Sequence, residues 1–343
     1  MKIKRAFLFL LLMILLIGAW GVWNIFGPVI QNPEKTFLYI RTGGNYQDVK
    51  DSLQKNNFIN GNFWFDQIAK YVDYPQNVKV GKYKITNGMS LYHLMKMLRS
   101  GKQVPVNLVI TKLRTKEDLA KRIATRFEVD STSAMHFLNN GEVLQQFNVD
   151  TNTVMTDVIP NTYTYMWNTS MENIFSKLYD ESKRFWNPER LQKAERLKLS
   201  PQEVYTLASI VEEETNEQDD KGKIASVYMN RLRKGMKLAA DPTVKFAMRD
   251  FALKRIYHKY LEFVSPYNTY LNAGLPPGPI CTPSIKTIDA VLDLPETDYL
   301  FFVARPDFSG YSDFASTYSQ HQVNAKAYQQ ALDSLIKSKQ ENQ

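Results

Sequence analysis

Eighteen consecutive residues near the start of the chain, Ala6–Trp23, carry no charged side chain. A helix of that length rises about 27 Å, close to the roughly 30 Å hydrocarbon core of a bilayer. Three basic residues precede the run, and tryptophans lie at its far end, as is typical of membrane interfaces. A cleaved signal peptide is the alternative, but Gly18-Ala19-Trp20 is a poor cleavage site. We expect a transmembrane helix over residues 6–27, with residues 1–5 forming a cytoplasmic tail.

The rest of the chain has the composition of a folded protein. It has 343 residues, of which 44% are hydrophobic and 23% charged, enough for two domains or for one large domain with an appendage. The net charge is +8 and the pI is about 9.2. The basic residues are spread along the sequence, and an anchored domain meets anionic lipid and acidic wall polymers, so we expect no nucleic-acid partner.

Cysteine and histidine are too scarce and too scattered to build a common metal site. Cys281 is the single cysteine, so no internal disulfide can form, and the four histidines lie far apart in sequence. The sequence contains no His-Glu-x-x-His motif and no Gly-rich phosphate loop. These observations predict that the protein needs no cofactor.

Residues 34–105 show a weak repeat of strand, turn and capped helix. Strands are predicted at Thr36–Arg41 and Gly81–Ile85, with helices capped by Asn45 and Ser90, and a third unit starts at Val106. Small units of this kind look like a LysM-type module, which binds N-acetylated glycans. Strand–turn–helix units are common, so periodicity alone identifies no ligand.

The strongest helix signal in the sequence covers residues 200–215. Ser200 is a capping residue, Pro201 suits the first helical position, and Glu203 completes a capping box. Apolar residues then recur at helical spacing, which predicts one buried face. They are Val204, Leu207, Ala208 and Val211.

Three glutamates end this helix. At about 100° per residue, Glu213 points away from the apolar face, while Glu212 and Glu214 lie on its two edges. Desolvation and neighbouring like charge raise the pKa of a carboxyl in such a place, as a general acid requires. Solvated surface is the alternative for all three, and helix geometry does not choose between Glu212 and Glu214.

Later segments add polar groups and an irregular loop. A second helix begins at Asp219 or Asp220, Asp241-Pro242 marks another helix start, and Gly274–Ile280 holds too many prolines and glycines for regular structure. We expect a buried strand at Leu300–Val303 and a closing helix at Tyr318–Leu332.

The order and spacing of these motifs resemble the endolytic murein transglycosylase (YceG-like) family over nearly the whole chain. The motifs that carry the resemblance are Ala208-Ser209-Ile210-Val211-Glu212-x-Glu214-Thr215, Asn230-Arg231-Leu232, Asp241-Pro242-Thr243-Val244, Tyr267-Asn268-Thr269-Tyr270 and Gly274-Leu275-Pro276-Pro277-Gly278. The chain departs from the family pattern at Asn161, where an acid is usual, at Ala239, where a Gln is usual, and at His321-Gln322. These departures concern details of substrate contact.

The resemblance implies a lytic transglycosylase that cleaves the bond between N-acetylmuramic acid and N-acetylglucosamine within uncrosslinked glycan strands, leaving an anhydro end. It assigns the catalytic acid to Glu212. We expect Asn268, Tyr270 and Asp241 to position the sugar or the acid, with Tyr267 and Thr269 beside them. Glu214 either supports the acid or pairs with Arg231. The alternatives are a helix cap for Asp241 and core packing for the tyrosines.

The predicted fold class is α+β. We expect a transmembrane helix, a LysM-like module over 34–105 and a larger mixed catalytic domain over 106–338. The resemblance also implies a bacterial inner-membrane protein whose catalytic domain is extracytoplasmic, with glycan strands as substrate and peptidoglycan synthases as candidate partners. Two other functions stay open: a hydrolase using Glu212 and Asp241 as a carboxylate pair, and a non-catalytic scaffold that binds peptidoglycan.

Overall fold

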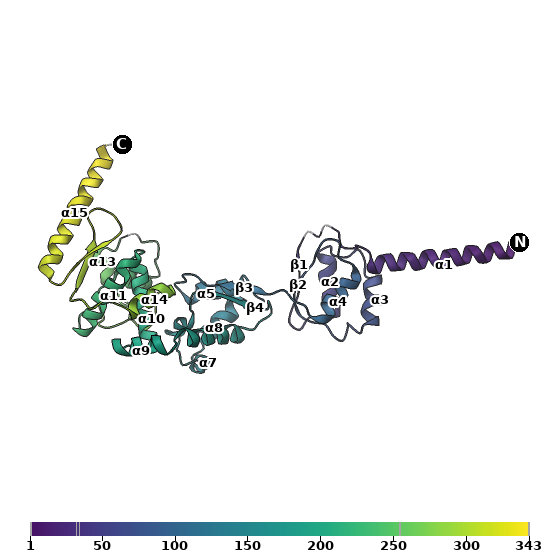
Figure 1. Cartoon of the computed structure of the whole chain (residues 1–343), viewed down its shortest axis with the longest axis horizontal. Coiled ribbons are helices and arrows are strands. Elements are labelled where there is room, and N and C mark those ends of the chain that lie inside the picture. Colours follow the sequence, from purple (N-terminus) through teal and green to yellow (C-terminus); the bar gives the residue numbers. More distant parts are fainter. Residues whose placement is uncertain (1, 32, 34, 254, 342–343) are drawn as a thin grey trace. The chain divides into compact units, whose positions relative to one another are not determined.

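The computed structural model describes residues 2–31, 33, 35–253 and 255–341. Met1 of the predicted tail, and Asn32 and Glu34 of the segment after the apolar helix, lie outside the described residues. The chain forms two compact units. The first unit comprises Met1–Leu108 with Ala124–Asp130 and Thr164–Ser170, and the second comprises the remaining residues. The fold is mixed α+β, as predicted, with short two-stranded sheets among many helices (Figure 1).

The apolar run is a helix, α1 (Lys2–Phe26). Within its segment Lys4–Phe26, an 18-residue window has a mean hydropathy of 2.5 and is 6% buried, so the segment is long and apolar enough to cross a membrane. Its end contacts two helices of the same unit, α3 (Phe63–Tyr71) and α4 (Leu91–Ser100).

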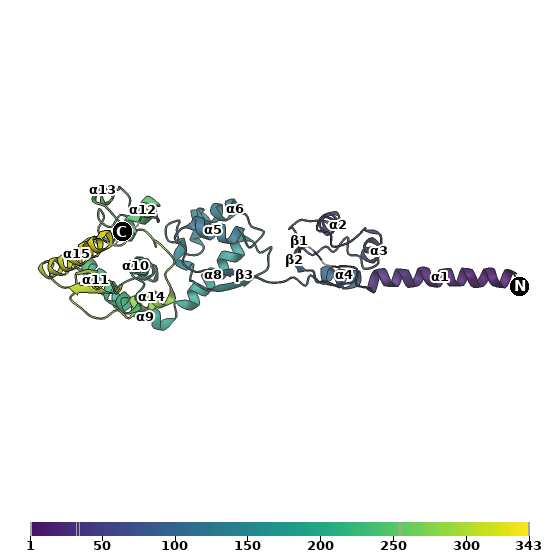
Figure 2. The ribbon, with the colours of Figure 1, turned by 90° about the horizontal axis from the view of Figure 1, so that it is seen from above.

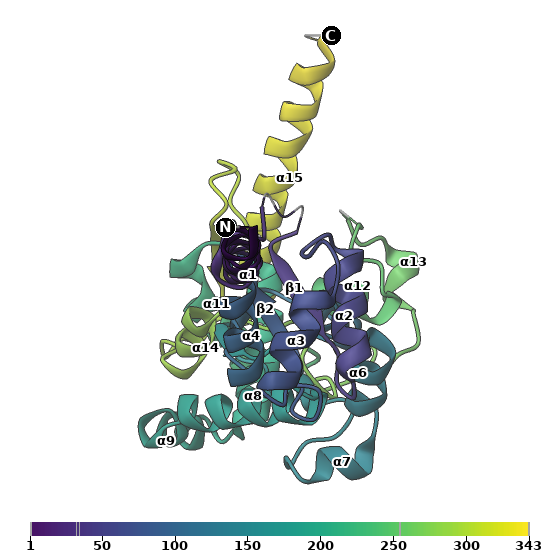
Figure 3. The ribbon, with the colours of Figure 1, turned by 90° about the vertical axis from the view of Figure 1, so that its right-hand side faces the viewer.

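The rest of the first unit is a small sheet covered by helices. Strands β1 (Phe37–Ile40) and β2 (Gly81–Lys84) pair antiparallel, with Phe37 opposite Lys84. Helices α2 (Tyr46–Lys55), α3 and α4 enclose a core that includes Leu38, Val49, Leu53 and Leu94 (Figure 3). The predicted caps are present, because Asn45 and Ser90 accept backbone hydrogen bonds at the starts of α2 and α4. Helix α3 was not predicted; Asn62 occupies its N-cap position but makes no side-chain cap.

A second sheet pairs β3 (Val106–Val109) with β4 (Thr162–Tyr165). The sequence predicts a strand that starts at Val106. It also predicts an ordered loop over residues 159–163, because Pro160 is followed by polar turn formers. The alternating exposure of Thr162–Tyr165 shows that these residues form a half-buried strand instead. The helical elements of this region are α5 (Lys116–Ala124), α6 (Ser131–Leu138), α7 (Gly141–Gln145), the 3₁₀ turn η1 (Val154–Asp157), α8 (Met171–Phe185) and α9 (Pro188–Leu197).

The core of the second unit surrounds α10 (Pro201–Glu214). The capping box is formed: the Ser200 Oγ accepts from the Glu203 backbone N–H at 3.3 Å, and the Glu203 carboxylate accepts from the Ser200 N–H at 2.7 Å. The predicted apolar face is buried, but Tyr205, Ser209 and Ile210 are buried too. The helix is therefore enclosed on nearly all sides, by α11 (Gln218–Arg233), α12 (Asp241–Met248) and α14 (Ile285–Leu292) (Figure 2).

The second unit ends in a hairpin and a long helix. Strands β5 (Phe301–Ala304) and β6 (Ser312–Ala315) pair antiparallel, and α15 (Tyr318–Glu341) packs on both (Figure 1). The prediction of a buried strand at Leu300–Val303 is wrong in its burial, because every residue of β5 stays partly exposed at the edge of a two-stranded sheet. The closing helix extends beyond the predicted Leu332. Helix α13 (His258–Leu261) is a single turn.

We predict that Leu207→Ala lowers the free energy of unfolding of the second unit by about 2–5 kcal/mol, because Leu207 is fully buried in α10 and truncation leaves a cavity. Leu191→Ala is the matched control: this leucine is 44% exposed, and its loss should cost roughly 0.5 kcal/mol or less. Denaturant unfolding of the full chain in mild detergent, followed by circular dichroism, measures both. Equal effects would contradict the placement of Leu207 in the core.

Candidate active site

Three consecutive carboxylates end α10, and they enter three different environments. A helix C-terminus carries partial negative charge, so acidic side chains there need compensating partners. Each glutamate of 212–214 finds different ones, because successive side chains on a helix point about 100° apart.

Glu212 is held as an ion-paired carboxylate. Its Oε2 accepts from Lys221 Nζ at 3.0 Å, from Ser284 Oγ at 3.1 Å and from Thr287 Oγ1. Lys221 also donates to Thr287 Oγ1 at 2.7 Å, and its side chain is only 7% exposed. Burial alone would raise the pKa of Glu212, but the hydrogen bonds from Thr287 and Lys221 outweigh it and lower the pKa below its usual value. The expected raised pKa is therefore wrong for Glu212.

Glu213 is also ion-paired. Lys112 Nζ lies 2.9 Å from its Oε1, and Arg114 donates to both carboxylate oxygens, at 3.1 and 3.0 Å. Burial acts to raise the pKa of Glu213, but the bonds from Arg114 and Lys112 lower it overall. Glu213 points away from the predicted apolar face, yet its side chain is only 15% exposed because these two cations cover it.

Glu214 differs from both neighbours, since it has no ion-pair partner among the described residues. Its Oε1 accepts a hydrogen bond from the Tyr228 hydroxyl at 2.5 Å. Burial raises the pKa of Glu214 to about 7; the Tyr228 bond lowers it and the nearby Asp241 charge raises it further. Arg231 lies in the same electrostatic environment, but its guanidinium donates to the carbonyls of Leu238 and Leu300. Glu214 therefore carries a proton over part of the neutral range.

Asp241 and Tyr270 lie beside Glu214 and open to solvent. Tyr270 donates its hydroxyl to Asp241 Oδ1 at 2.7 Å, and Asp241 is exposed while Tyr270 is half-buried. Asp241 is not the helix cap considered above, because Ala240 occupies the N-cap position of α12 and no side chain caps it. The second Asp241 oxygen is available for a ligand's hydroxyl or N–H.

The other three residues predicted to contact the sugar instead make hydrogen bonds and packing contacts within the protein. Asn268 is fully buried and donates to the carbonyls of Leu261 and Phe263, at 2.9 and 2.8 Å. Thr269 is buried and its Oγ1 accepts from the Ala240 N–H at 3.0 Å, at the start of α12. Tyr267 packs on Phe246 with ring centres 4.7 Å apart. These three residues shape the loop that carries Tyr270.

The Pro- and Gly-rich loop at 274–280 has no regular structure, as predicted, and is fixed against α10. Ser209 Oγ accepts from the Ile280 N–H at 3.0 Å, and Cys281 Sγ lies 3.4 Å from the Ser209 carbonyl. A Cβ at Gly278 would lie 2.1 Å from the Asn152 carbonyl oxygen, so only glycine fits there.

Sequence reasoning missed four residues that define these environments: Ser209, Lys221, Tyr228 and Thr287. All four are buried polar residues. A polar side chain within an apolar helical pattern is the one signal that could have indicated them, since buried polar groups need partners. It does not identify the partners.

The chemistry available is proton transfer. A carboxyl with a pKa near 7 can donate a proton and then accept one, and an adjacent exposed carboxylate with its tyrosine can orient a polar ligand. Within residues 2–31, 33, 35–253 and 255–341, no group of three or more His, Cys, Asp or Glu side chains is arranged to hold a metal ion.

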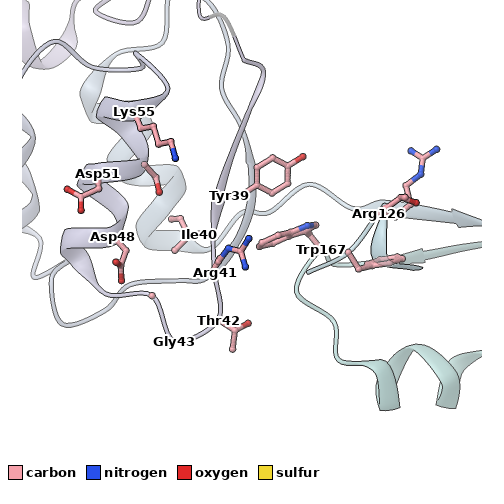
Figure 4. A pocket seen from close by; sticks show the side chains of 14 residues that line it. Tyr39, Ile40, Arg41, Thr42, Gly43, Asp48, Asp51, Lys55, Arg126 and Trp167 are labelled. Atoms are coloured by element: carbon pink, nitrogen blue, oxygen red, sulfur yellow. The ribbon is translucent and has the colours of Figure 1, made fainter. Parts of the chain in front are cut away.

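The first unit has a separate cavity of about 770 Å³ (Figure 4). The rings of Tyr39 and Trp167 form one wall, with centroids 4.9 Å apart, and Asp48, Asp51 and Lys55 follow one another along α2. Thr42 closes one end by donating from its N–H and its hydroxyl to the Glu128 carboxylate, at 2.8 and 2.6 Å. An aromatic wall facing charged groups suits a carbohydrate.

Comparisons with known proteins cover most of the chain. An endolytic murein transglycosylase of Bacillus subtilis (strain 168) is 29% identical over 322 residues, which are 89% of this chain and 88% of that protein. An endolytic murein transglycosylase of Streptococcus pneumoniae serotype 2 is 26% identical over 309 residues, 81% of this chain and 56% of that protein. The crystal structure of a yceG-like protein of Listeria monocytogenes matches with a TM-score of 0.56 and 29% identity, over 83% of this chain and 97% of that one.

A family model described as YceG-like matches residues 38–327, which include every element of the site described above. This chain belongs to the YceG-like family.

Proposed function

We propose that this protein is an endolytic murein transglycosylase that cleaves glycan strands of peptidoglycan. The observation that carries the proposal is the protonatable Glu214 beside the open Asp241–Tyr270 pair. The names of the similar proteins from Bacillus subtilis and Streptococcus pneumoniae support the same substrate class.

The hydrogen-bond partners of the two carboxyls support Glu214 rather than Glu212 as the proton donor in this proposal. Glu212 accepts three hydrogen bonds, one from a buried ammonium, and all of them stabilise its ionised form. Glu214 has a single neutral donor and a pKa of about 7. The assignment of the acid to Glu212 stays a prediction from the family resemblance, whereas the contacts suggest that Glu212 joins α10 to α11 and α14.

The proposed reaction uses one carboxyl twice. Protonated Glu214 donates to the oxygen that links N-acetylmuramic acid to N-acetylglucosamine, and the bond to the anomeric carbon breaks. The Glu214 carboxylate then takes the proton from the hydroxymethyl group of the same muramic residue, whose oxygen bonds to the anomeric carbon. An anhydro end results and no water is consumed. Positioned acid–base catalysis supplies roughly 10²–10⁴-fold of the rate; binding and distortion of the sugar supply the rest.

The membrane-spanning role of α1 is part of the proposal. Basic residues before the span support a cytoplasmic N-terminus, so we expect the rest of the first unit and the whole second unit to lie on the extracytoplasmic side. Cleavage there would end or release nascent strands beside peptidoglycan synthases, the proposed partners.

The cavity of the first unit supports a second proposal, a glycan-binding role for the LysM-like module. Tyr39 is 42% exposed at the cavity, so part of its ring is accessible for stacking on a sugar. We predict that Tyr39→Ala weakens binding of N-acetylglucosamine oligomers by about fivefold or more in calorimetry, since stacking contributes about 1 kcal/mol or more. Tyr71→Ala, on an exposed tyrosine outside the cavity, is the control. Equal affinity of both variants would contradict this role.

The decisive test of the activity is mass spectrometry of glycan fragments from uncrosslinked peptidoglycan. Wild type should release anhydro ends, and Glu214→Gln should reduce them about 10²–10⁴-fold, because an amide cannot donate the proton. Glu212→Gln should stay within about tenfold of wild type while losing thermal stability, because Lys221 loses its charged partner.

Each of the other outcomes would support a different catalytic acid or a different function. Loss of activity in Glu212→Gln alone would restore Glu212 as the acid. Reducing ends would indicate the two-carboxylate hydrolase. Glycan bound but uncut by the wild type, under conditions in which the Bacillus subtilis relative cuts it, would favour the scaffold.

The pH profile gives an independent prediction. The acid is protonated below its pKa of about 7, so kcat/KM should fall about tenfold per pH unit above that value. Because the Tyr228 hydrogen bond lowers the pKa of Glu214, Tyr228→Phe should move the falling limb to higher pH. Rates measured from pH 5 to 9 would test this, and a limb that Tyr228→Phe leaves in place would rule out Glu214 as its source.

A further inference from the structure

A groove between α3 and α4 in the first unit has the chemistry of an anion site. Its volume is about 590 Å³, and Lys79, Lys96 and Arg99 line it above an apolar floor of Ile68, Val72 and Met95. No acidic residue lines it. In the described part of the chain, none of the three cations forms an ion pair.

The groove follows one face of α4. Tyr92, Met95, Lys96 and Arg99 are spaced i, i+3, i+4 and i+7, so they lie along a single stripe of the helix. Lys96 and Arg99 are therefore neighbours, and nothing within α4 separates their charges.

Two aromatic contacts place this groove next to the end of the apolar helix α1. The rings of Tyr92 and Phe26 are 5.2 Å apart, and Phe26 is the last residue of α1. The rings of Trp20 and Trp64 are 5.4 Å apart, and the Trp64 ring comes within 3.0 Å of the Cβ position of Gly21. The last two turns of α1 thus pack directly on α3 and α4 (Figures 1 and 2).

These contacts place the groove close to the end of α1. Trp20 and Trp64, with the 64% exposed Phe63, form an aromatic cluster of the kind that lies at a membrane interface. Along α4, Lys96 is about 6 Å and Arg99 about 10 Å from Tyr92. The headgroup layer on each side of a bilayer is roughly 5–7 Å thick. Lys96 and Arg99 therefore lie within about two helical turns of the contact between α4 and the end of α1, a distance comparable to the thickness of the headgroup layer.

We propose that this groove binds the phosphate headgroup of an anionic phospholipid of the membrane that α1 enters. The proposal rests on the proposed anchoring by α1. Lysine and arginine donate to phosphate oxygens, and the apolar floor accommodates the start of the acyl chains. Such a lipid would hold the first unit against the membrane surface at a second point besides α1.

The test uses the purified full chain in neutral detergent and native mass spectrometry, with phosphatidylglycerol or phosphatidylcholine as the added lipid. Wild type should retain one phosphatidylglycerol in preference to phosphatidylcholine. The triple variant K79Q/K96Q/R99Q should bind it roughly a hundredfold more weakly, since each basic residue contributes about a factor of five. The control K35Q/K50Q/K82Q removes the same charge from the same unit outside the groove and should keep the preference.

Three results would overturn the proposal: no preference in wild type, equal loss in the control variant, or full retention by the triple variant with an unchanged circular dichroism spectrum. Complete displacement of the lipid by millimolar inorganic phosphate would show a site for soluble anions instead. Measuring glycan cleavage by the same variants in detergent tests the proposed activity independently of lipid binding. Alkaline extraction from vesicles tests anchoring by α1 independently of the groove.

Discussion

The C-terminus of α10 imposes the constraint on which the second unit depends. Three adjacent carboxylates there oppose the helix dipole and are largely withdrawn from water, so each needs compensation. The compensation comes from three directions: Lys221 with Thr287 for Glu212, Lys112 with Arg114 for Glu213, and the Tyr228 hydroxyl for Glu214. Because these partners lie on different segments, satisfying the three acids also fixes how α11, α14 and the 112–114 segment pack around α10.

Unequal compensation gives neighbouring carboxyls different acidities. Glu212 and Glu213 receive cations, which keep both ionised, while Glu214 receives only a hydroxyl and keeps a pKa of about 7. Divergent pKa values in neighbouring carboxyls are the usual sign of separate roles. The helical repeat produces the divergence, since side chains one and two positions apart face different parts of the protein. The carboxyl without a cation is also the one beside the exposed Asp241–Tyr270 pair.

Local rules predicted the features that depend on nearby residues. The capping box at Ser200 and the cap at Asn45 involve groups no more than three residues apart, and both formed as expected; Asp48 also completes a capping box at Asn45. The Glu212–Thr287 bond joins residues 75 positions apart, and no local pattern encodes such a partner. The same limit explains Asp241, whose position before a proline resembles a cap although its carboxylate bonds Tyr270 from a distant loop. Helix geometry narrowed the acid to Glu212 or Glu214, but the contacts that distinguish them are all tertiary.

The clustering of basic side chains likewise depends on tertiary contacts that no local sequence pattern encodes. Basic residues are spread along the sequence and form no obvious block, yet residues 34–105 hold eleven basic and five acidic side chains. The fold then brings Lys79 beside Lys96 and Arg99 without an acid between them, close to the end of α1. Repulsion among three neighbouring cations costs stability unless an anion or salt screens it. In the proposed arrangement, with α1 as the membrane anchor, a membrane lipid is the nearest anion to the groove, so the same segment would also determine which ligand those cations meet.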